Sequence, residues 1–291
     1  MQEQKKFNRL LDILNYATNL LTEEGIKNPR LNVEMMLTSV LKCDRIKLYL
    51  NFDMPLNQKE IIEFKSILKR RINHEPLQYI LKKTSFYGYD ISLNNSVLIP
   101  RQETEILVET FLNAIDKIDN RDIRILEIGT GSGCISIAVA NELKKRNRDY
   151  HIKSIDISSE AIKVAENNKI AQNSENLEFE VKDMLDIKNF NDFDYIITNP
   201  PYISLAEYNK LDQEILKYEP EIALTDKSDG CTFYRHILKK LKATSSKCKI
   251  YFEIGNDIKE NLELLLDSLK LSNCLFIKDY NGLYRILIVE N

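Results

Sequence analysis

The sequence predicts an α/β protein in which a parallel sheet, covered by helices on both faces, follows a small helical bundle. Two observations lead to this fold class. From residue 123 onwards, short apolar segments alternate with amphipathic segments of ten or more residues, as in βαβ units. Before residue 74, apolar residues recur every three to four positions, as in packed helices. The 291 residues suffice for one large or two ordinary domains.

Three helices are expected in residues 1–73. The first carries an apolar stripe over residues 10–21, and the second occupies residues 30–42, after Pro29. The third begins at Asn57, whose side chain can cap the helix while Glu60 completes a capping box, and it ends before Pro76. This bundle contains no motif of candidate catalytic or cofactor-binding residues, so we expect it to take part in substrate recognition.

Residues 74–100 differ from the bundle in amino-acid composition. The stretch LQYILKKTSFYGYDISLNNSVLIP (77–100) is rich in Tyr, Ile, Val and Ser and has turn residues at Gly88, Asn94 and Asn95. We therefore expect a β-hairpin linker, closed by Pro100, that leads into a third region at residues 101–291.

Residues 101–291 are expected to form the sheet domain. The final two strands are separated by a tight Asn281-Gly282 turn, so they should pair antiparallel at the end of the sheet. The expected strands are residues 123–129, 151–157, 177–183, 193–199, 248–255, 274–280 and 283–290, and the expected helices are 133–146, 159–171 and 258–269.

Composition excludes several classes of protein. Hydrophobic residues make up 43% of the chain, charged residues 29%, and the net charge is -3, so duplex DNA is a weak candidate partner. The first 21 residues lack the continuous apolar core of a signal peptide or membrane span. Five widely spaced cysteines without C-x-x-C spacing argue against a disulfide framework or a zinc site, and no metal is expected. We expect a cytoplasmic monomer.

A glycine-rich turn follows the first strand of the sheet domain, in ILEIGTGSGCISIA. Glycines at this position allow a sharp turn and close approach to a ligand. The dinucleotide fingerprint needs a glycine where Cys134 stands, and the observed G-x-G-x-G spacing is that of sheets that bind S-adenosylmethionine (SAM). The candidate cofactor residues here are Glu127, Gly129, Thr130, Gly131, Ser132 and Gly133.

Acidic residues end the next two strands. Asp156 lies where a carboxylate accepts hydrogen bonds from ribose hydroxyls, and Asp183 lies where it can reach an adenine amino group, with Met184 beside the ring. Either acid alone is better explained as a helix N-cap or a solvated turn. Three consecutive strands that each end in a fitting residue favour the cofactor interpretation.

The fourth strand runs into Asn199-Pro200-Pro201-Tyr202. An Asn-Pro turn is a common loop, but this one lies on the same sheet edge as the glycine turn. The Asn199 side-chain carbonyl and the Pro200 backbone carbonyl can accept hydrogen bonds from both N–H bonds of a planar amide or amino group. Pro201 stiffens the turn, and Tyr202 offers its ring to the group being methylated. We expect catalysis by Asn199, Pro200 and Tyr202, with Asn199 also near the cofactor.

The sequence resembles the HemK/PrmC family of release factor glutamine methyltransferases over nearly its whole length. N-P-P-Y alone is shared with adenine-N6 DNA methylases and some RNA methylases, whereas the combination of motifs is more specific. One departure is Lys82, near a position where the family usually has glycine. The matching segments are EPLQYI (75–80), LIPRQETEILVE (98–109), EIGTGSG (127–133), NPPYIS (199–204), YEPEIAL (218–224), FEIG (252–255) and KDYNGLYRILI (278–288).

This resemblance implies a SAM-dependent catalytic domain, joined by a hairpin to a helical domain, that methylates the glutamine of the Gly-Gly-Gln tripeptide in class-one peptide chain release factors. The product of the cofactor is S-adenosylhomocysteine. The resemblance also suggests that Arg101 and Glu219 line the substrate site. A surface ion pair of Arg101 explains this residue as well as a role in lining the pocket does. Favourable placement in the first turn of a helix likewise explains Glu103 and Glu105 equally well.

Two other functions remain open at this stage. The first is methylation of an amino group in nucleic acid, such as adenine N6, with a flipped base stacked on Tyr202. That activity favours a basic face, and the chain offers only the short run Lys69-Arg70-Arg71. The second is a SAM-binding module without catalysis, which has no need of two aligned acceptors.

Overall fold

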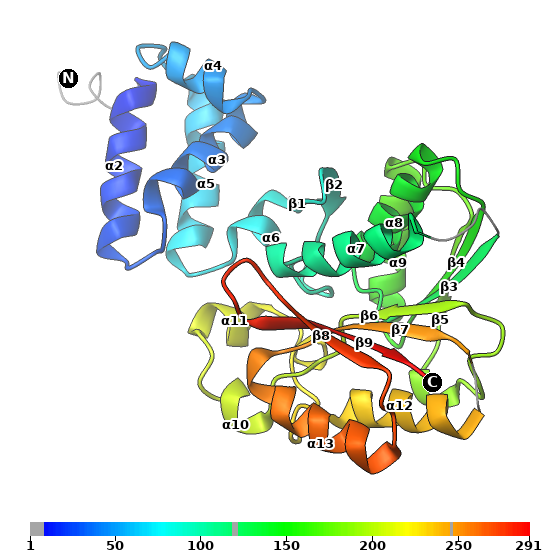
Figure 1. The fold of residues 1–291 in the computed structure, drawn as a ribbon. Helices are drawn as coiled ribbons and strands as arrows, with labels where there is room; N and C mark the ends of the chain where they lie inside the picture. The colour runs from blue at the N-terminus through cyan, green and yellow to red at the C-terminus, as the bar shows by residue number, and fades with distance from the viewer. Residues whose placement is uncertain (1–8, 118–121, 245–246) are drawn as a thin grey trace. The chain divides into compact units, whose positions relative to one another are not determined.

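The computed structural model describes residues 9–117, 122–244 and 247–291 (Figure 1). The chain divides into two compact units, residues 1–82 and residues 83–291. Within the described residues, no helix is both long and apolar enough to span a membrane.

The first unit is helical, as the sequence predicts. The predicted capping box is confirmed, because Asn57 accepts from the Glu60 N–H and the Glu60 side chain accepts from the Asn57 N–H. Buried Glu34 joins two helices by accepting from Arg45 at 2.6 Å. The helices are α2 (Leu10–Glu23), α3 (Pro29–Leu41), α4 (Arg45–Leu50), α5 (Gln58–Ile72) and α6 (Leu77–Leu81).

Helix α6 occupies residues that the sequence analysis assigned to the hairpin, so that assignment was wrong for residues 77–81. Pro76 precedes the helix, and its carbonyl accepts from the N–H groups of Tyr79 and Ile80. Leu77, Tyr79 and Ile80 are buried, a spacing that suits a helix and not an alternating strand. The hairpin itself is present and shorter than expected, with β1 (Lys83–Phe86) paired antiparallel to β2 (Tyr89–Ser92).

Replacing Lys82 by glycine is expected to stabilise the first unit by about 0.5 to 1 kcal/mol. Lys82 ends α6 in the left-handed conformation, with φ 59° and ψ 23°. A residue with a Cβ atom is strained there, and glycine is not, although glycine loses more backbone entropy on folding. Urea unfolding should show a higher midpoint. The matched control is Lys65→Gly in the exposed middle of α5, which should lower stability by about 1 kcal/mol.

The second unit contains a seven-stranded sheet with the order β5-β4-β3-β6-β7-β9-β8. All pairs are parallel except β7–β9 and β8–β9, so the predicted antiparallel end of the sheet is confirmed. The strands are β3 (Ile123–Ile128), β4 (Tyr150–Asp156), β5 (Leu177–Val181), β6 (Tyr195–Thr198), β7 (Lys249–Glu253), β8 (Cys274–Lys278) and β9 (Tyr284–Glu290).

Helices cover both faces of this sheet, as expected for an α/β fold (Figure 1). One face is covered by α7 (Gln102–Ile115), α8 (Cys134–Lys145) and α9 (Ser159–Ala171). The other is covered by α12 (Thr232–Thr244) and α13 (Lys259–Leu269), whose apolar residues share one core with β6, β7 and β9. Short helices lie in the connections: η1 (Met184–Asp186), α10 (Leu205–Tyr208), α11 (Gln213–Tyr218), η2 (Glu221–Ala223) and η3 (Asn256–Ile258).

The strand order places a switch point between β3 and β6. From β3 the chain moves outward to β4 and β5, and it then returns to the other side of β3 as β6 and β7. Ile128 at the end of β3 lies opposite Thr198 at the end of β6. The turns that follow these two strands therefore meet at one edge of the sheet, where doubly wound sheets bind their ligands.

Candidate active site

A cavity of about 320 Å³ opens at this switch point. That volume falls in the range of small-molecule sites. Its walls come from the segment before α7, from the glycine turn after β3, from the ends of β4 and β5, and from the turn after β6, with further contributions from η2 and α12. Among the residues that line it are Arg101, Thr104, Gly129, Thr130, Gly131, Ser132, Asp156, Asp183, Met184, Asn199, Pro200 and Pro201.

Two of the three glycines face open space and the third is packed. A Cβ atom at Gly129 or Gly131 meets no atom within 4 Å, and both residues have positive φ, at 77° and 55°. A Cβ atom at Gly133 lies 3.1 Å from both Ala165 and Phe179. Gly129 and Gly131 thus leave room for a ligand, whereas Gly133 brings α8 close to α9 and β5.

Glu127 lies behind the cavity wall, not in it. Its carboxylate is buried and accepts from the Thr130 hydroxyl at 2.6 Å. Burial raises the pKa of Glu127 to about 7, and hydrogen bonds, of which that from Thr130 is the strongest, oppose the rise. The Glu127 carboxylate therefore stabilises the glycine turn through its hydrogen bond with Thr130.

Asp156 joins the glycine turn to the end of β4. One carboxylate oxygen accepts from the Gly131 N–H at 2.9 Å and the other from the Ser158 N–H at 2.9 Å. Burial raises the pKa of Asp156, and these backbone donors oppose the rise. The carboxylate lines the cavity and can exchange a backbone donor for a ligand hydroxyl.

Asp183 caps a helix, and it also lines the cavity. Its carboxylate accepts from the Leu185 N–H at 2.9 Å at the start of η1. Met184 follows it in the wall.

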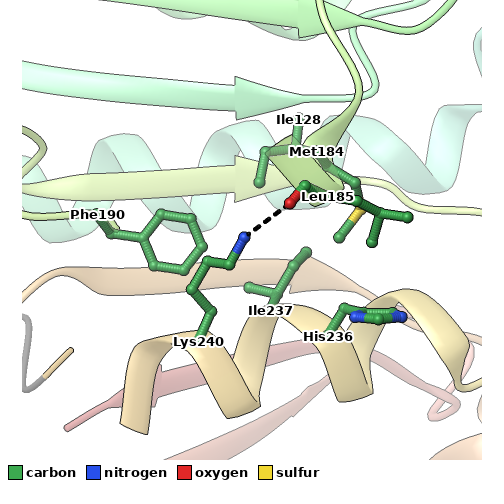
Figure 2. Close-up of a pocket in the computed structure, with 7 residues that line it drawn as sticks. All are labelled: Ile128, Met184, Leu185, Phe190, His236, Ile237 and Lys240. Carbon is green, nitrogen blue, oxygen red and sulfur yellow. Dashed lines mark hydrogen bonds between the residues drawn. The ribbon is translucent and has the colours of Figure 1, made fainter. Parts of the chain in front are cut away.

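A second cavity of about 290 Å³ adjoins the first and shares Ile128, Met184 and Leu185 with it. Figure 2 shows Lys240 of α12 extending from the opposite wall to the Leu185 carbonyl. The Lys240 ammonium group donates to that carbonyl at 3.3 Å and also to the carbonyl of Ile187. Helix α12 thereby holds the segment after β5. Neither α12 nor Lys240 was predicted from the sequence, and the contact of Lys240 with this segment depends on how α12 packs.

Asn199 follows β6, and its side-chain Nδ2 donates to the Thr104 hydroxyl of α7 at 3.2 Å. Asn199, Pro200 and Pro201 line the cavity, whereas Tyr202 does not. The Tyr202 hydroxyl donates to Glu253 Oε1 at 3.3 Å. Burial raises the pKa of Tyr202, so its hydroxyl keeps its proton.

Two glycines enclose Tyr202. A Cβ atom at Gly255 lies 3.0 Å from Cδ2 of the Tyr202 ring, and one at Gly230 lies 2.4 Å from the Tyr202 carbonyl oxygen. The absence of side chains at both positions lets the turn after β6 pack closely against its neighbours. The Tyr202 ring therefore helps to hold the turn after β6 in place by packing against Gly255.

The remaining candidates lie around the segment that precedes α7. Arg101 lines the cavity and forms an ion pair with the buried carboxylate of Glu219 at 2.6 Å. Glu219 ends α11 and is not part of the lining. Glu105 accepts from the Tyr87 N–H at 2.8 Å in the hairpin turn, and Glu103 is exposed in the first turn of α7.

A cavity at the switch point of a β5-β4-β3-β6-β7-β9-β8 sheet, with a glycine turn after β3 and an acid at the end of β4, defines a class I SAM-dependent methyltransferase. Comparison with known families supports this class for the second unit and also finds a match in the first. The description "PrmC N-terminal domain" matches residues 12–81, and "Methyltransferase domain" matches residues 119–275. The chain belongs to the family of release factor glutamine methyltransferases.

Individual relatives match along nearly the whole chain. The chain is 38% identical to the release factor glutamine methyltransferase of Fusobacterium nucleatum, over 96% of this chain and 78% of that protein. It is 33% identical to that of Geobacter sulfurreducens, over 99% and 98%. Among solved structures, the hMettl16 catalytic domain, crystallised with the MAT2A 3′UTR hairpin 6, shares the fold at 13% identity with a TM-score of 0.55, over 79% of this chain and 81% of that one.

Proposed function

We propose that this protein transfers a methyl group from SAM to the side-chain amide nitrogen (N5) of the glutamine in the Gly-Gly-Gln motif of class-one peptide chain release factors. Family membership supports this proposal. The observation that carries it is the Asn199 amide in the cavity wall, held through its nitrogen by Thr104. Its oxygen is then the end that is available to a substrate amide.

The cavity fits SAM by the chemistry of its lining. Gly129 and Gly131 leave open space, Asp156 offers a carboxylate to ribose hydroxyls, and Met184 offers an apolar surface to an adenine ring. Glu127, Thr130, Ser132, Gly133 and Asp183 complete the proposed cofactor site, some in the wall and some behind it. When bound, SAM supplies an electrophilic methyl group.

The protein must make a weak nucleophile reactive. An amide nitrogen is poorly nucleophilic because its lone pair is delocalised into the carbonyl group. The Asn199 side-chain oxygen and the Pro200 backbone carbonyl are each proposed to accept a hydrogen bond from one N–H group of the substrate amide. These two hydrogen bonds orient the amide nitrogen toward the methyl group. Such positioning can supply up to about 7 to 11 kcal/mol of the barrier. The Tyr202 ring and Pro201 keep this turn rigid, and Arg101 with Glu219 shapes the neighbouring wall.

The test of this function uses SAM that carries a labelled methyl group. Purified protein should label a class-one release factor, and the label should disappear when the glutamine of its Gly-Gly-Gln motif is replaced by alanine. Total RNA and duplex DNA are included as competing substrates. Label on nucleic acid and none on release factor would establish the alternative activity and overturn the proposal.

We further propose that the helical unit recognises the release factor, because one glutamine side chain is too small to be distinguished from others by the cavity alone. Helix α4 offers an apolar surface for this purpose. Ile46 and Leu50 lie four residues apart on it and are 72% and 78% exposed.

The double variant Ile46→Ser/Leu50→Ser is expected to lower kcat/KM for intact release factor by about tenfold or more, because truncating interface residues that contribute to binding costs more than about 1 kcal/mol. A short Gly-Gly-Gln peptide should be methylated at an unchanged rate, because it makes no remote contact. Initial-rate kinetics on both substrates measure the difference. Ile170→Ser, at a 71% exposed position on α9, is the matched control and should leave both values unchanged. Equal losses on protein and peptide would contradict recognition by α4.

A further inference from the structure

We propose that Asn168 is a positioning residue that holds the glycine turn of the cofactor site and couples this turn to the hairpin of β1 and β2. The inference deepens the proposed function and rests on its cofactor site. Asn168 belongs to α9, and it is not among the described residues that line the cavity. Its exposed fraction is 0%, so its amide is fully removed from water.

The Asn168 side-chain amide makes three hydrogen bonds to the backbone of two other segments. Its Oδ1 accepts from the Ser92 N–H at 2.8 Å. Its Nδ2 donates to the Ser92 carbonyl at 3.0 Å and to the Ser132 carbonyl at 2.9 Å. An asparagine amide has two N–H bonds, and both are used here. One backbone donor and two backbone acceptors therefore fix a single orientation of this amide.

Helix α9 holds the hairpin through two side chains that lie one helical turn apart. Gln172 follows Asn168 by four residues, and its Nε2 donates to the Asp90 carbonyl at 2.6 Å. Four residues of a helix rise about 6 Å, and two residues of a strand span about 7 Å, so this pair matches alternate residues of β2. Among the described residues, the Gln172 side chain hydrogen-bonds only the hairpin, whereas Asn168 also bonds the glycine turn.

Ser132 is the residue of the glycine turn that Asn168 holds. It is 2% exposed and lines the cavity. Its hydroxyl oxygen is buried and has no hydrogen-bond partner among the described residues. A buried hydroxyl without a partner is costly unless a ligand satisfies it, and SAM is the ligand that the lining fits. By bonding the Ser132 carbonyl, Asn168 fixes the backbone that carries this hydroxyl.

The other partner of Asn168, strand β2, leads into a second wall of the same cavity. Val97 and Pro100 follow Ser92 closely in the chain, and both line the cavity. One buried amide therefore joins the glycine turn to the start of the segment that forms this second wall. A ligand that fixes the Ser132 backbone should hold the hairpin in return, because coupling between two sites is reciprocal.

Binding measurements separate the contact with the glycine turn from the contact with the hairpin. Asn168→Asp keeps an acceptor for the Ser92 N–H and removes the Nδ2 donor to Ser132. It should lower affinity for S-adenosylhomocysteine, measured by calorimetry, by about tenfold or more, and Asn168→Ala should lower it at least as much. Gln172→Ala removes a contact with the hairpin alone and should leave affinity within twofold, as should Asn167→Ala at the exposed neighbouring position.

Kinetics distinguish positioning of the cofactor from general loss of structure. In Asn168→Asp the KM for SAM should rise by tenfold or more, whereas kcat at saturating SAM should stay within threefold of the parent. Thermal melting with and without S-adenosylhomocysteine shows which variants are folded.

Hydrogen exchange tests the coupling in the parent protein without any turnover. S-adenosylhomocysteine should slow exchange of the Ser92 N–H by threefold or more, because the bound ligand holds the turn and, through Asn168, the hairpin. The Tyr87 N–H is the matched control, since it lies in the same hairpin and donates to Glu105 instead. Its exchange should not change, and the effect at Ser92 should disappear in Asn168→Asp.

Three results would each overturn the proposal: parental affinity in Asn168→Asp, an equal loss of affinity in Gln172→Ala, or unchanged exchange at Ser92 in the parent. A parent protein that binds S-adenosylhomocysteine and labels no release factor would refute the proposed substrate and leave this inference intact. A parent protein that does not bind S-adenosylhomocysteine would overturn both.

Discussion

Replacing Asn199 by alanine is expected to lower the rate of methyl transfer to release factor by about 10²-fold or more. The substitution removes one of the two acceptors proposed to align the substrate amide, and loss of one such aligned hydrogen bond typically costs 10² to 10³ in rate. Affinity for SAM should change by no more than a few-fold, because the glycine turn and Asp156 are unaffected. Single-turnover kinetics with labelled SAM, together with calorimetry, measure the two quantities separately.

Asn209→Ala is the matched control for this substitution. Asn209 is exposed after α10, where its amide donates to the Leu205 carbonyl, and it does not line the cavity. Its removal should leave turnover within twofold of the parent. Parental turnover in Asn199→Ala itself would refute the proposed alignment of the substrate by this residue.

Replacing Asp156 by alanine is expected to weaken SAM binding by about 1.5 to 3 kcal/mol, or roughly 10- to 150-fold. The reason is the loss of charge-assisted hydrogen bonds to the ribose hydroxyls. Turnover at saturating SAM should fall much less than the affinity does. Calorimetric titration with SAM and with S-adenosylhomocysteine provides the measurement.

The structure suggests two companion variants for this test. Asp156→Asn keeps an acceptor for the Gly131 N–H and removes the charge, so it separates cofactor binding from support of the glycine turn. Asp186→Ala removes an exposed carboxylate in η1 that does not line the cavity, and it should leave affinity within twofold. Unchanged affinity in Asp156→Ala would show that Asp156 is a structural cap and not a ligand of the cofactor.

Much of the fold follows from local patterns along the chain. An apolar stripe was enough to predict α2, because a helix that packs on one side repeats every 3.6 residues. Pro29 and the Asn57/Glu60 capping box marked the starts of α3 and α5. The turn at Asn281-Gly282 similarly identified β8 and β9 as an antiparallel pair. Local patterns failed for α6, since so short a helix is stabilised by neighbours that the sequence does not show. Helix α12 was not predicted, although its buried residues Tyr234, Ile237, Leu238 and Leu241 follow helical spacing.

The candidate site shows the same division between local and long-range information. The residue types at the ends of β3, β4 and β5 pointed to a cofactor site and those after β6 to a catalytic turn, and Gly129, Asp156, Asp183 and Asn199 all line one cavity. Asn199 also contacts Thr104, which is 95 positions away in the sequence, and no local pattern predicts that contact.

The sequence by itself determined the class of this protein: the order of its helices and strands, the glycine turn, and the motifs that place it in a methyltransferase family. Only the tertiary structure decided which side chains face the cavity and which support it. Glu127 and Tyr202 belong to motifs that suggest ligand contact, yet neither is among the residues that line the cavity: Glu127 is buried, and the partly buried Tyr202 packs closely against Gly255. Gly133 packs against Ala165 and Phe179. The physical reason is that strand order and helix packing, not sequence spacing, set the distances between residues far apart in the chain.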